Sequence, residues 1–166
     1  MKVKVKKLHP DAVIPSYATD GSAGMDLTAT RMEIDNDGNL VAHTDLAFEI
    51  PKGYVGLLFP RSSISKKDIS LANSVGVLDS DYRGEVTFKF KSHFKFVNPL
   101  RFWWKVIFRK KYTVSFLCYN QWRHVYKAGD RVGQIVIVQH PEIEFIESDD
   151  LTKTERGTGG YGSTGR

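Results

Sequence analysis

The sequence predicts an all-β fold, either a barrel or a sandwich, on three observations. Short β-branched or aromatic runs recur along the 166 residues. Glycine, proline, aspartate or asparagine stands near the end of each run, which is typical of strands bounded by turns. Long patterns of helical period are missing. The length fits a single domain.

The expected elements follow in chain order. Residues 2–8 alternate polar and apolar side chains, which indicates a half-buried strand. Pro51-Lys52-Gly53 is expected to be a turn between two later strands. A short helix is expected around residues 63–69. The other expected strands cover the runs at 40–50, 54–59, 86–90 and 134–138.

Composition excludes several classes of protein. Hydrophobic residues make up 41% of the chain and charged residues 26%, as in a folded globular protein. No run approaches the roughly 18 apolar residues of a membrane span. Residues 1–7 lack the apolar stretch of a secretory signal. The one cysteine, Cys118, excludes a disulfide framework and a cysteine-rich zinc site, so a cytoplasmic location is expected.

The net charge of +5 belongs to one segment. The 44 residues between Glu85 and Asp130 contain ten bases and no acid. Residues 94–126 also hold 11 of the 20 aromatics and all three tryptophans, which predicts an aromatic, basic insert at about 91–126. Interleaved rings and cations suit single-stranded nucleic acid, a membrane surface or a protein groove. The favoured interpretation is an extended hairpin whose rings pack on the barrel or on a neighbouring subunit.

The last 11 residues, 156–166, contain five glycines and cannot build a core. We therefore expect one β domain over residues 1–155 and a flexible arm over 156–166. A frayed terminus is one interpretation of this arm. The other is a nucleotide-binding segment, because glycine amides, hydroxyls and the Arg156 guanidinium suit phosphates, and the Tyr161 ring suits a base.

Two further motifs carry chemistry. Pro60-Arg61-Ser62-Ser63 follows an expected strand and can form an anion site, with a helix cap as the alternative. Residues 76–84 are expected to form a hairpin turn in which Asp79 can accept a proton from water and Tyr82 can pack against a sugar. Ordinary turn chemistry is the alternative there. The five histidines are scattered without metal-ligand spacing.

Together, five blocks in order resemble the signature of the trimeric dUTP pyrophosphatases (dUTPases). The blocks are 23–27, 60–63, 73–84, 129–134 and 156–165, and the resemblance leaves out only about 91–126. It implies a jelly-roll β fold and a homotrimer with three shared active sites. It also implies magnesium-dependent hydrolysis of dUTP to dUMP and pyrophosphate, which limits uracil in DNA and supplies dUMP for thymidylate synthesis.

The resemblance implies a role for each matching residue. Asp79 would activate the water that attacks the α-phosphorus, and Tyr82 would lie under the deoxyribose. Asp26 would be structural or act through metal-bound water. Mg²⁺ would be held by the triphosphate and water, without a direct protein ligand. The uracil would be read by Asn73 and the backbone of Gly76, Val77, Gly84 and Thr87. The phosphates would be held by Arg61, Ser62, Ser63 and Gln134. The closing arm would contribute Arg156, Tyr161, Gly162, Ser163 and Thr164, with Tyr161 stacked on uracil.

Two departures from the family pattern are expected to be mild. Tyr161 stands where the family usually has Phe, and Gly133 stands where it usually has Ala. Two alternative functions remain open. The first is a dCTP deaminase-like enzyme, which resembles dUTPases in fold but needs a glutamate where Lys89 stands. The second is a regulatory or binding module that acts through residues 94–126 on nucleic acid or a protein.

Overall fold

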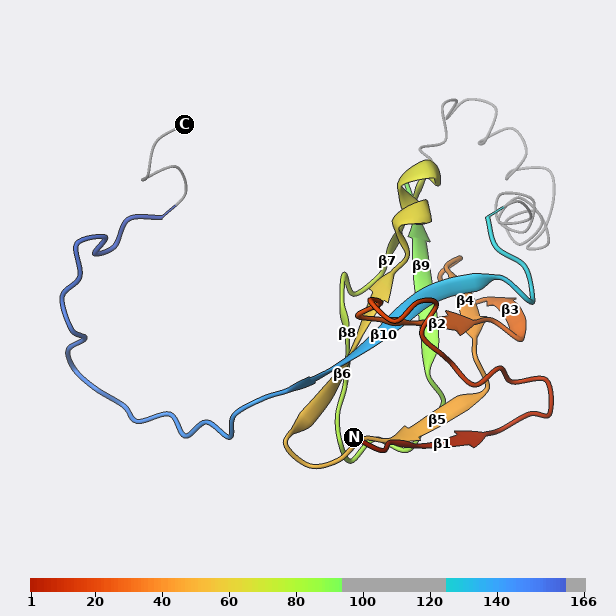
Figure 1. Ribbon diagram of the computed structural model, residues 1–166. Helices are drawn as coiled ribbons and strands as arrows, with labels where there is room; N and C mark the ends of the chain where they lie inside the picture. The colour runs from red at the N-terminus through yellow and green to blue at the C-terminus, as the bar shows by residue number, and fades with distance from the viewer. Residues whose placement is uncertain (94–124, 161–166) are drawn as a thin grey trace, which may run out of the picture.

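The computed structural model describes residues 1–93 and 125–160 (Figure 1). These ranges contain strands, one short 3-10 helix and no α-helix. The elements are β1 (Lys4–Lys7), β2 (Met25–Thr28), β3 (Arg31–Ile34), β4 (Leu40–His43), β5 (Leu46–Glu49), β6 (Tyr54–Pro60), η1 (Ser62–Lys66), β7 (Ile69–Leu71), β8 (Gly76–Leu78), β9 (Thr87–Ser92) and β10 (Arg131–Gln139).

Two four-stranded sheets make the body. One has the order β2-β10-β6-β8 and the other β3-β4-β9-β7, and β1 pairs with β5 beside them. Every pairing among the described strands is antiparallel. The core contains side chains from both sheets, including the fully buried Leu27, Phe88, Phe90, Val132 and Ile135. The all-β expectation is confirmed.

Most of the expected strands are present, but the run at 40–50 is wrong as a single strand. It divides into β4 and β5, because Asp45 adopts a left-handed φ of 50° between them. The expected turn at 51–53 is confirmed, since the Tyr54 N–H donates to the Pro51 carbonyl at 3.1 Å and Gly53 has a φ of 82°. The expected helix at 63–69 is the shorter η1, and Ile69 begins β7.

The third block is not a hairpin, contrary to the expectation. β8 pairs with β6 in one sheet, whereas β9 pairs with β4 and β7 in the other. Residues 79–86 therefore connect the two sheets. The loop begins after Leu78, the last residue of the edge strand β8. It ends at Thr87, the first residue of β9, which is a central strand of the other sheet.

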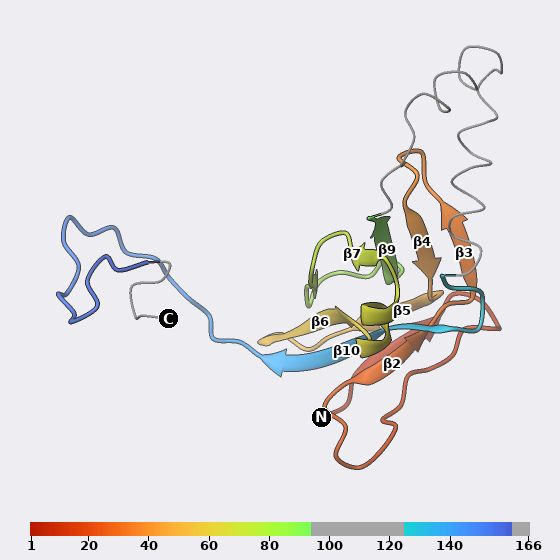
Figure 2. The same ribbon diagram turned by 90° about the horizontal axis from the view of Figure 1, so that it is seen from above.

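Residues 140–160 run away from the body after β10, as both views show (Figures 1 and 2). No strand or helix lies in this stretch. Its apolar side chains lie in water: Phe145 is 93% exposed and Leu151 is 88% exposed. An extended apolar segment that its own chain leaves uncovered is typical of a segment that packs on another molecule. In the described ranges, no helix is long and apolar enough to cross a membrane.

Candidate active site

Asp26 is the centre of a polar cluster on the sheet that contains β2, β10 and β6. Its Oδ1 accepts hydrogen bonds from Arg61 Nε at 2.8 Å and from Gln134 Nε2 at 3.1 Å. Its Oδ2 accepts one from Arg131 at 3.0 Å. The register of β10 brings these side chains together, because Gln134 lies opposite Asp26 on β2 and opposite Phe59 on β6. The first, second and fourth blocks thus come together.

The charge of this cluster suits an anion. Two guanidiniums face one carboxylate, which leaves a formal excess of one positive charge. The Asp26 side chain is 13% exposed, whereas that of Arg131 is 55% exposed. Arg61 meets Asp26 through its Nε atom. Asp26 therefore orients the guanidiniums, and their remaining N–H groups can bind an oxyanion in the forked geometry that phosphate prefers.

Ser62 and Ser63 begin η1, and Arg61 stands at its N-cap position in extended conformation, with a φ of −76° and a ψ of 154°. No side chain caps this helix. The alternative interpretation of the second block as a serine helix cap is therefore wrong. Neither serine hydroxyl caps the helix.

Lys67 and Tyr126 lie next to η1, and no pattern in the sequence singles them out. The Lys67 ammonium donates to the Val125 carbonyl and lies 4.5 Å from the centre of the Tyr126 ring. Tyr126 is buried against Phe90, with 5.2 Å between ring centres. Burial raises the pKa of the Tyr126 phenol, while the Ser63 side chain and the Arg61 charge oppose the rise. No local pattern could pair residues about 60 positions apart in sequence.

The third block lies along β6. Gly76 pairs with Leu58, and a Cβ at Gly76 would lie 2.9 Å from the Leu58 Cβ, so the close approach of β8 requires glycine. Asn73, Asp79 and Thr87 are exposed, and Val77 is 64% exposed. These side chains are open to a ligand, whereas Gly76, whose backbone is predicted to read the base, is buried in the single chain.

Tyr82 is 46% exposed, and its hydroxyl donates to the Glu85 carbonyl at 3.1 Å. Its backbone N–H donates to the Asp79 carbonyl at 3.2 Å. A Cβ at Gly84 would lie 2.4 Å from the Tyr82 hydroxyl oxygen, so the ring packs directly over the Gly84 backbone. The turn therefore presents the Asp79 carboxylate and the Tyr82 ring on one short loop.

One chain does not bring the two halves of the predicted site together. β8 is antiparallel to β6, so Leu78 lies opposite Gly56, five residues before Arg61. At about 3.3 Å per residue, the start of the loop that carries Asp79 lies about 17 Å from Arg61, measured along β6. Asp79 and Tyr82 therefore lie toward one end of β6, and the Asp26 cluster lies at the other.

Most of the predicted arm residues lie beyond the described part of the chain. Arg156 is exposed, and its Nε donates to the Gly159 carbonyl at 3.0 Å. Tyr161, Gly162, Ser163 and Thr164 lie outside the described residues, as do 94–124 of the predicted insert. The roles assigned to these residues stay predictions.

The described donors fit phosphate better than a metal ion. Among residues 1–93 and 125–160, no group of three or more histidine, cysteine or acidic side chains could hold a metal. The Asp26 carboxylate already accepts three hydrogen bonds. Guanidinium and amide N–H groups bind oxyanions, so the residues of this cluster fit a phosphate.

Gly133 corrects one expectation from the sequence. A Cβ at this position would lie 2.1 Å from Cε1 and 2.3 Å from Cζ of the buried Phe88 ring. Real Cβ contacts do not come that close, so the ring and an alanine cannot both keep their places. The difference from the usual alanine is therefore not mild in this chain: glycine makes room for Phe88.

The fold and the Asp26 cluster define a class of protein: a two-sheet β domain in which two arginines and a glutamine surround one carboxylate on the sheet of β2, β10 and β6. The dUTPase family model matches residues 11–97 and 104–165, which include the five blocks and part of the predicted insert. The chain belongs to the dUTPase family. The jelly-roll expectation is confirmed with it.

Individual relatives resemble the chain along its length. A deoxyuridine 5′-triphosphate nucleotidohydrolase of Wolinella succinogenes is 36% identical over 168 residues, which cover 100% of this chain and 95% of the relative. Its counterpart from Nautilia profundicola is also 36% identical and is covered completely, as is this chain. A mutant dUTPase of Staphylococcus bacteriophage 80alpha, solved with dUpNHpp, has a TM-score of 0.73 at 27% identity, with 99% of each chain covered.

Proposed function

We propose that the chain hydrolyses dUTP to dUMP and pyrophosphate by attack of water on the α-phosphorus, with Asp79 as the base. Family membership makes the chain a dUTP diphosphatase. The observation that carries the proposal is the Asp26 cluster, in which Arg61, Arg131 and Gln134 form an anion site in the fold of that family.

The Asp26 cluster would hold the triphosphate. Arg61 and Gln134 would donate to phosphate oxygens, and the hydroxyls of Ser62 and Ser63 would bind others. Asp26 does not touch the nucleotide in this scheme, because its oxygens already accept from the side chains that it orients. Mg²⁺ bound to the triphosphate would neutralise charge on the leaving pyrophosphate. Fixed donors of this kind stabilise developing negative charge without reorganising.

The loop after β8 would hold the nucleoside and the water. Asp79 is exposed, so its carboxylate can accept a proton from water. The Tyr82 ring would pack against deoxyribose and leave no space for a 2′-hydroxyl. Asn73 and the backbone from Gly76 to Thr87 would pair with the uracil edge.

We further infer a homotrimer with shared active sites. Asp79 and the Asp26 cluster lie toward opposite ends of β6, so one chain does not supply both to one nucleotide. The stretch 140–160 leaves the body with exposed apolar side chains such as Phe145, which suits binding to a second copy. The arm that follows would then close over a neighbouring subunit's site. A cytoplasmic location stays a prediction.

The variant Asp79→Asn tests the assigned base. The amide keeps the shape of the side chain but cannot accept the proton, so turnover should fall by about 10² to 10⁴. Binding of the non-hydrolysable dUpNHpp should persist. Asp81→Asn is the matched control, because Asp81 is an exposed acid in the same loop without an assigned role, and it should keep near-normal pyrophosphate release. Near-normal turnover by Asp79→Asn would remove Asp79 from its role.

The deaminase alternative is disfavoured by Lys89. Its ammonium lies 2.9 Å from Asp35 Oδ2, and this hydrogen bond raises the pKa of Lys89. A lysine that stays charged cannot shuttle protons to and from a cytosine in the way a glutamate can. Ammonia release from dCTP would overturn this conclusion.

A further inference from the structure

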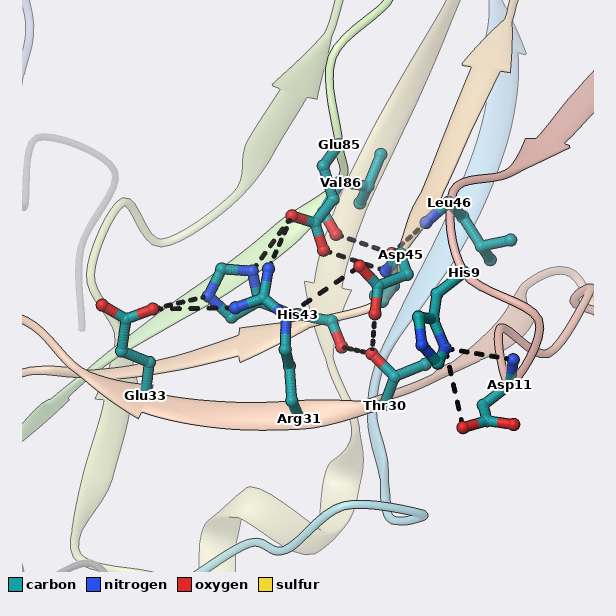
Figure 3. A network of polar contacts seen from close by, with 11 residues as sticks. His9, Asp11, Thr30, Arg31, Glu33, His43, Asp45, Leu46, Glu85 and Val86 are labelled. Carbon is teal, nitrogen blue, oxygen red and sulfur yellow. Dashed lines mark hydrogen bonds and ion pairs between the residues drawn. The ribbon is translucent and has the colours of Figure 1, made fainter.

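Glu85 is held by a polar network that the assigned chemistry does not use (Figure 3). Its Oε1 accepts the Asp45 backbone N–H at 2.9 Å. Its Oε2 lies 3.0 Å from His43 Nδ1 and 3.4 Å from Arg31. The side chain is only 20% exposed, so these contacts form largely out of water, where they are stronger. Both carboxylate oxygens thus attach Glu85 to β3, to β4 and to the turn after β4.

The backbone next to Glu85 is attached to the same turn. The Val86 N–H donates to the Leu46 carbonyl at 2.9 Å, and the Thr44 hydroxyl donates to the Val86 carbonyl at 2.6 Å. Val86 and Thr44 are fully buried. The end of the third block therefore has a fixed position relative to the core.

Tyr82 takes its position from that fixed point. Its ring is half exposed, so core packing does not hold it. Its hydroxyl donates to the carbonyl of Glu85, the residue whose carboxylate is attached to β4. Besides its contact with the Gly84 backbone, the ring therefore depends on the position of the Glu85 carbonyl.

We propose that Glu85 is a positioning residue for sugar recognition, which fixes the acceptor of the Tyr82 hydroxyl and so holds the ring where it excludes a 2′-hydroxyl. The inference rests on the proposed function of Tyr82. Arg31 also faces the carboxylates of Asp45 and Glu33, and the Nε2 atom of His43 lies 3.3 Å from Glu33.

The test compares kcat/KM for dUTP and UTP, measured as pyrophosphate release. Glu85→Ala removes the side-chain attachment to β4 and leaves the Glu85 carbonyl held through the backbone of Val86. The ratio of the two values should therefore fall by about tenfold, with dUTP affected more than UTP. Glu85→Gln keeps an acceptor for the Asp45 N–H but loses the charge facing His43 and Arg31. Its ratio should lie between those of Glu85→Ala and the wild type.

Glu33→Gln is the matched control. Glu33 contacts His43 and Arg31 in the same network but is 61% exposed and does not touch the third block, so its ratio should equal that of the wild type. Tyr82→Phe removes the other end of the hydrogen bond. Combined with Glu85→Ala, it should give a ratio close to that of either single variant, because both act through one ring position.

Equal losses for dUTP and UTP in Glu85→Ala would show a purely structural role and overturn the inference. If that variant does not fold, an unchanged ratio in Glu85→Gln overturns it equally. Additive effects of Tyr82→Phe and Glu85→Ala would also contradict it. A wild-type protein that does not prefer dUTP over UTP would instead refute the proposed function, so the two failures are distinguishable.

Discussion

At the scale of single residues, the pairing of Gly133 with Phe88 shows how one missing methyl group admits a large ring. Phe88 is 1% exposed and stacks with Phe90 at 6.3 Å between ring centres. Gly133 is also buried, on the facing strand β10 of the other sheet. The two sheets therefore approach each other here through a glycine and a ring rather than through two medium-sized side chains.

Gly133→Ala should lower the free energy of unfolding by about 1–3 kcal/mol, the usual cost of overpacking a core. Phe88→Leu combined with Gly133→Ala should recover part of the loss, because the smaller side chain vacates the space that the new methyl needs. Denaturant unfolding of both variants measures the effect. Full stability of the single variant would contradict the fit described here.

The residues that bind together at Asp26 were only partly predictable. Arg61 is assigned to the phosphates because its block suits anion binding and resembles a family signature, whereas Gln134 is assigned through the resemblance alone. Arg131 stood in the fourth block without a role, and its bond to Asp26 depends on the register of β10 against β2. Glu85, Lys67 and Tyr126 were missed, because contacts across sheets leave no local pattern.

At the scale of elements, alternation and turn residues predicted strands well where one face is buried. They failed at 40–50, where two apolar stretches flank a sharp turn at Asp45. They also failed at the third block, where two strands close in sequence join different sheets. In both places the strand pairing decides where a strand ends and which sheet it joins, and the partner strand lies far away in the chain.

The C-terminal arm gives the prediction at this scale. Removal of residues 156–166 should leave folding and assembly intact, because the described part of the arm is exposed and contributes little buried area. Turnover should collapse, since closing of the arm would exclude water and complete the phosphate contacts. Thermal unfolding and pyrophosphate release measure the two effects.

Tyr161→Phe in the full chain is the control for that truncation, because a phenyl ring stacks on a base as a phenol does. It should keep near-normal turnover. Aggregation of the truncated protein would instead show that the arm is structural.

At the scale of the whole molecule, hydrogen bonds hold the two described residues that flank 94–124, His93 and Val125, close to each other. The His93 N–H donates to the Asp68 carbonyl at 3.0 Å, and the Lys67 ammonium donates to the Val125 carbonyl. Consecutive residues thus hold the end of β9 and the chain that leads to β10. A short turn can bridge two ends held this way.

Replacing residues 94–124 by a Gly-Asn turn should therefore retain a trimer that hydrolyses dUTP, because no residue assigned to catalysis lies within the segment. Sedimentation and kinetics of the variant test this. A trimeric but inactive variant would show that the segment reaches the active site. An active trimer that has lost salt-sensitive affinity for single-stranded DNA would favour the binding role for its clustered cations.

The central claim is that this chain is a dUTP diphosphatase with a site built for deoxyuridine. Initial rates of pyrophosphate release from dUTP, dTTP, dCTP and UTP at equal concentration, with Mg²⁺, test it most directly. We expect hydrolysis of dUTP to be far faster than that of the other three. The thymine methyl and the cytosine edge would not fit the uracil pocket, and the 2′-hydroxyl of UTP would meet Tyr82. Comparable rates on dUTP, dTTP and UTP would contradict the account.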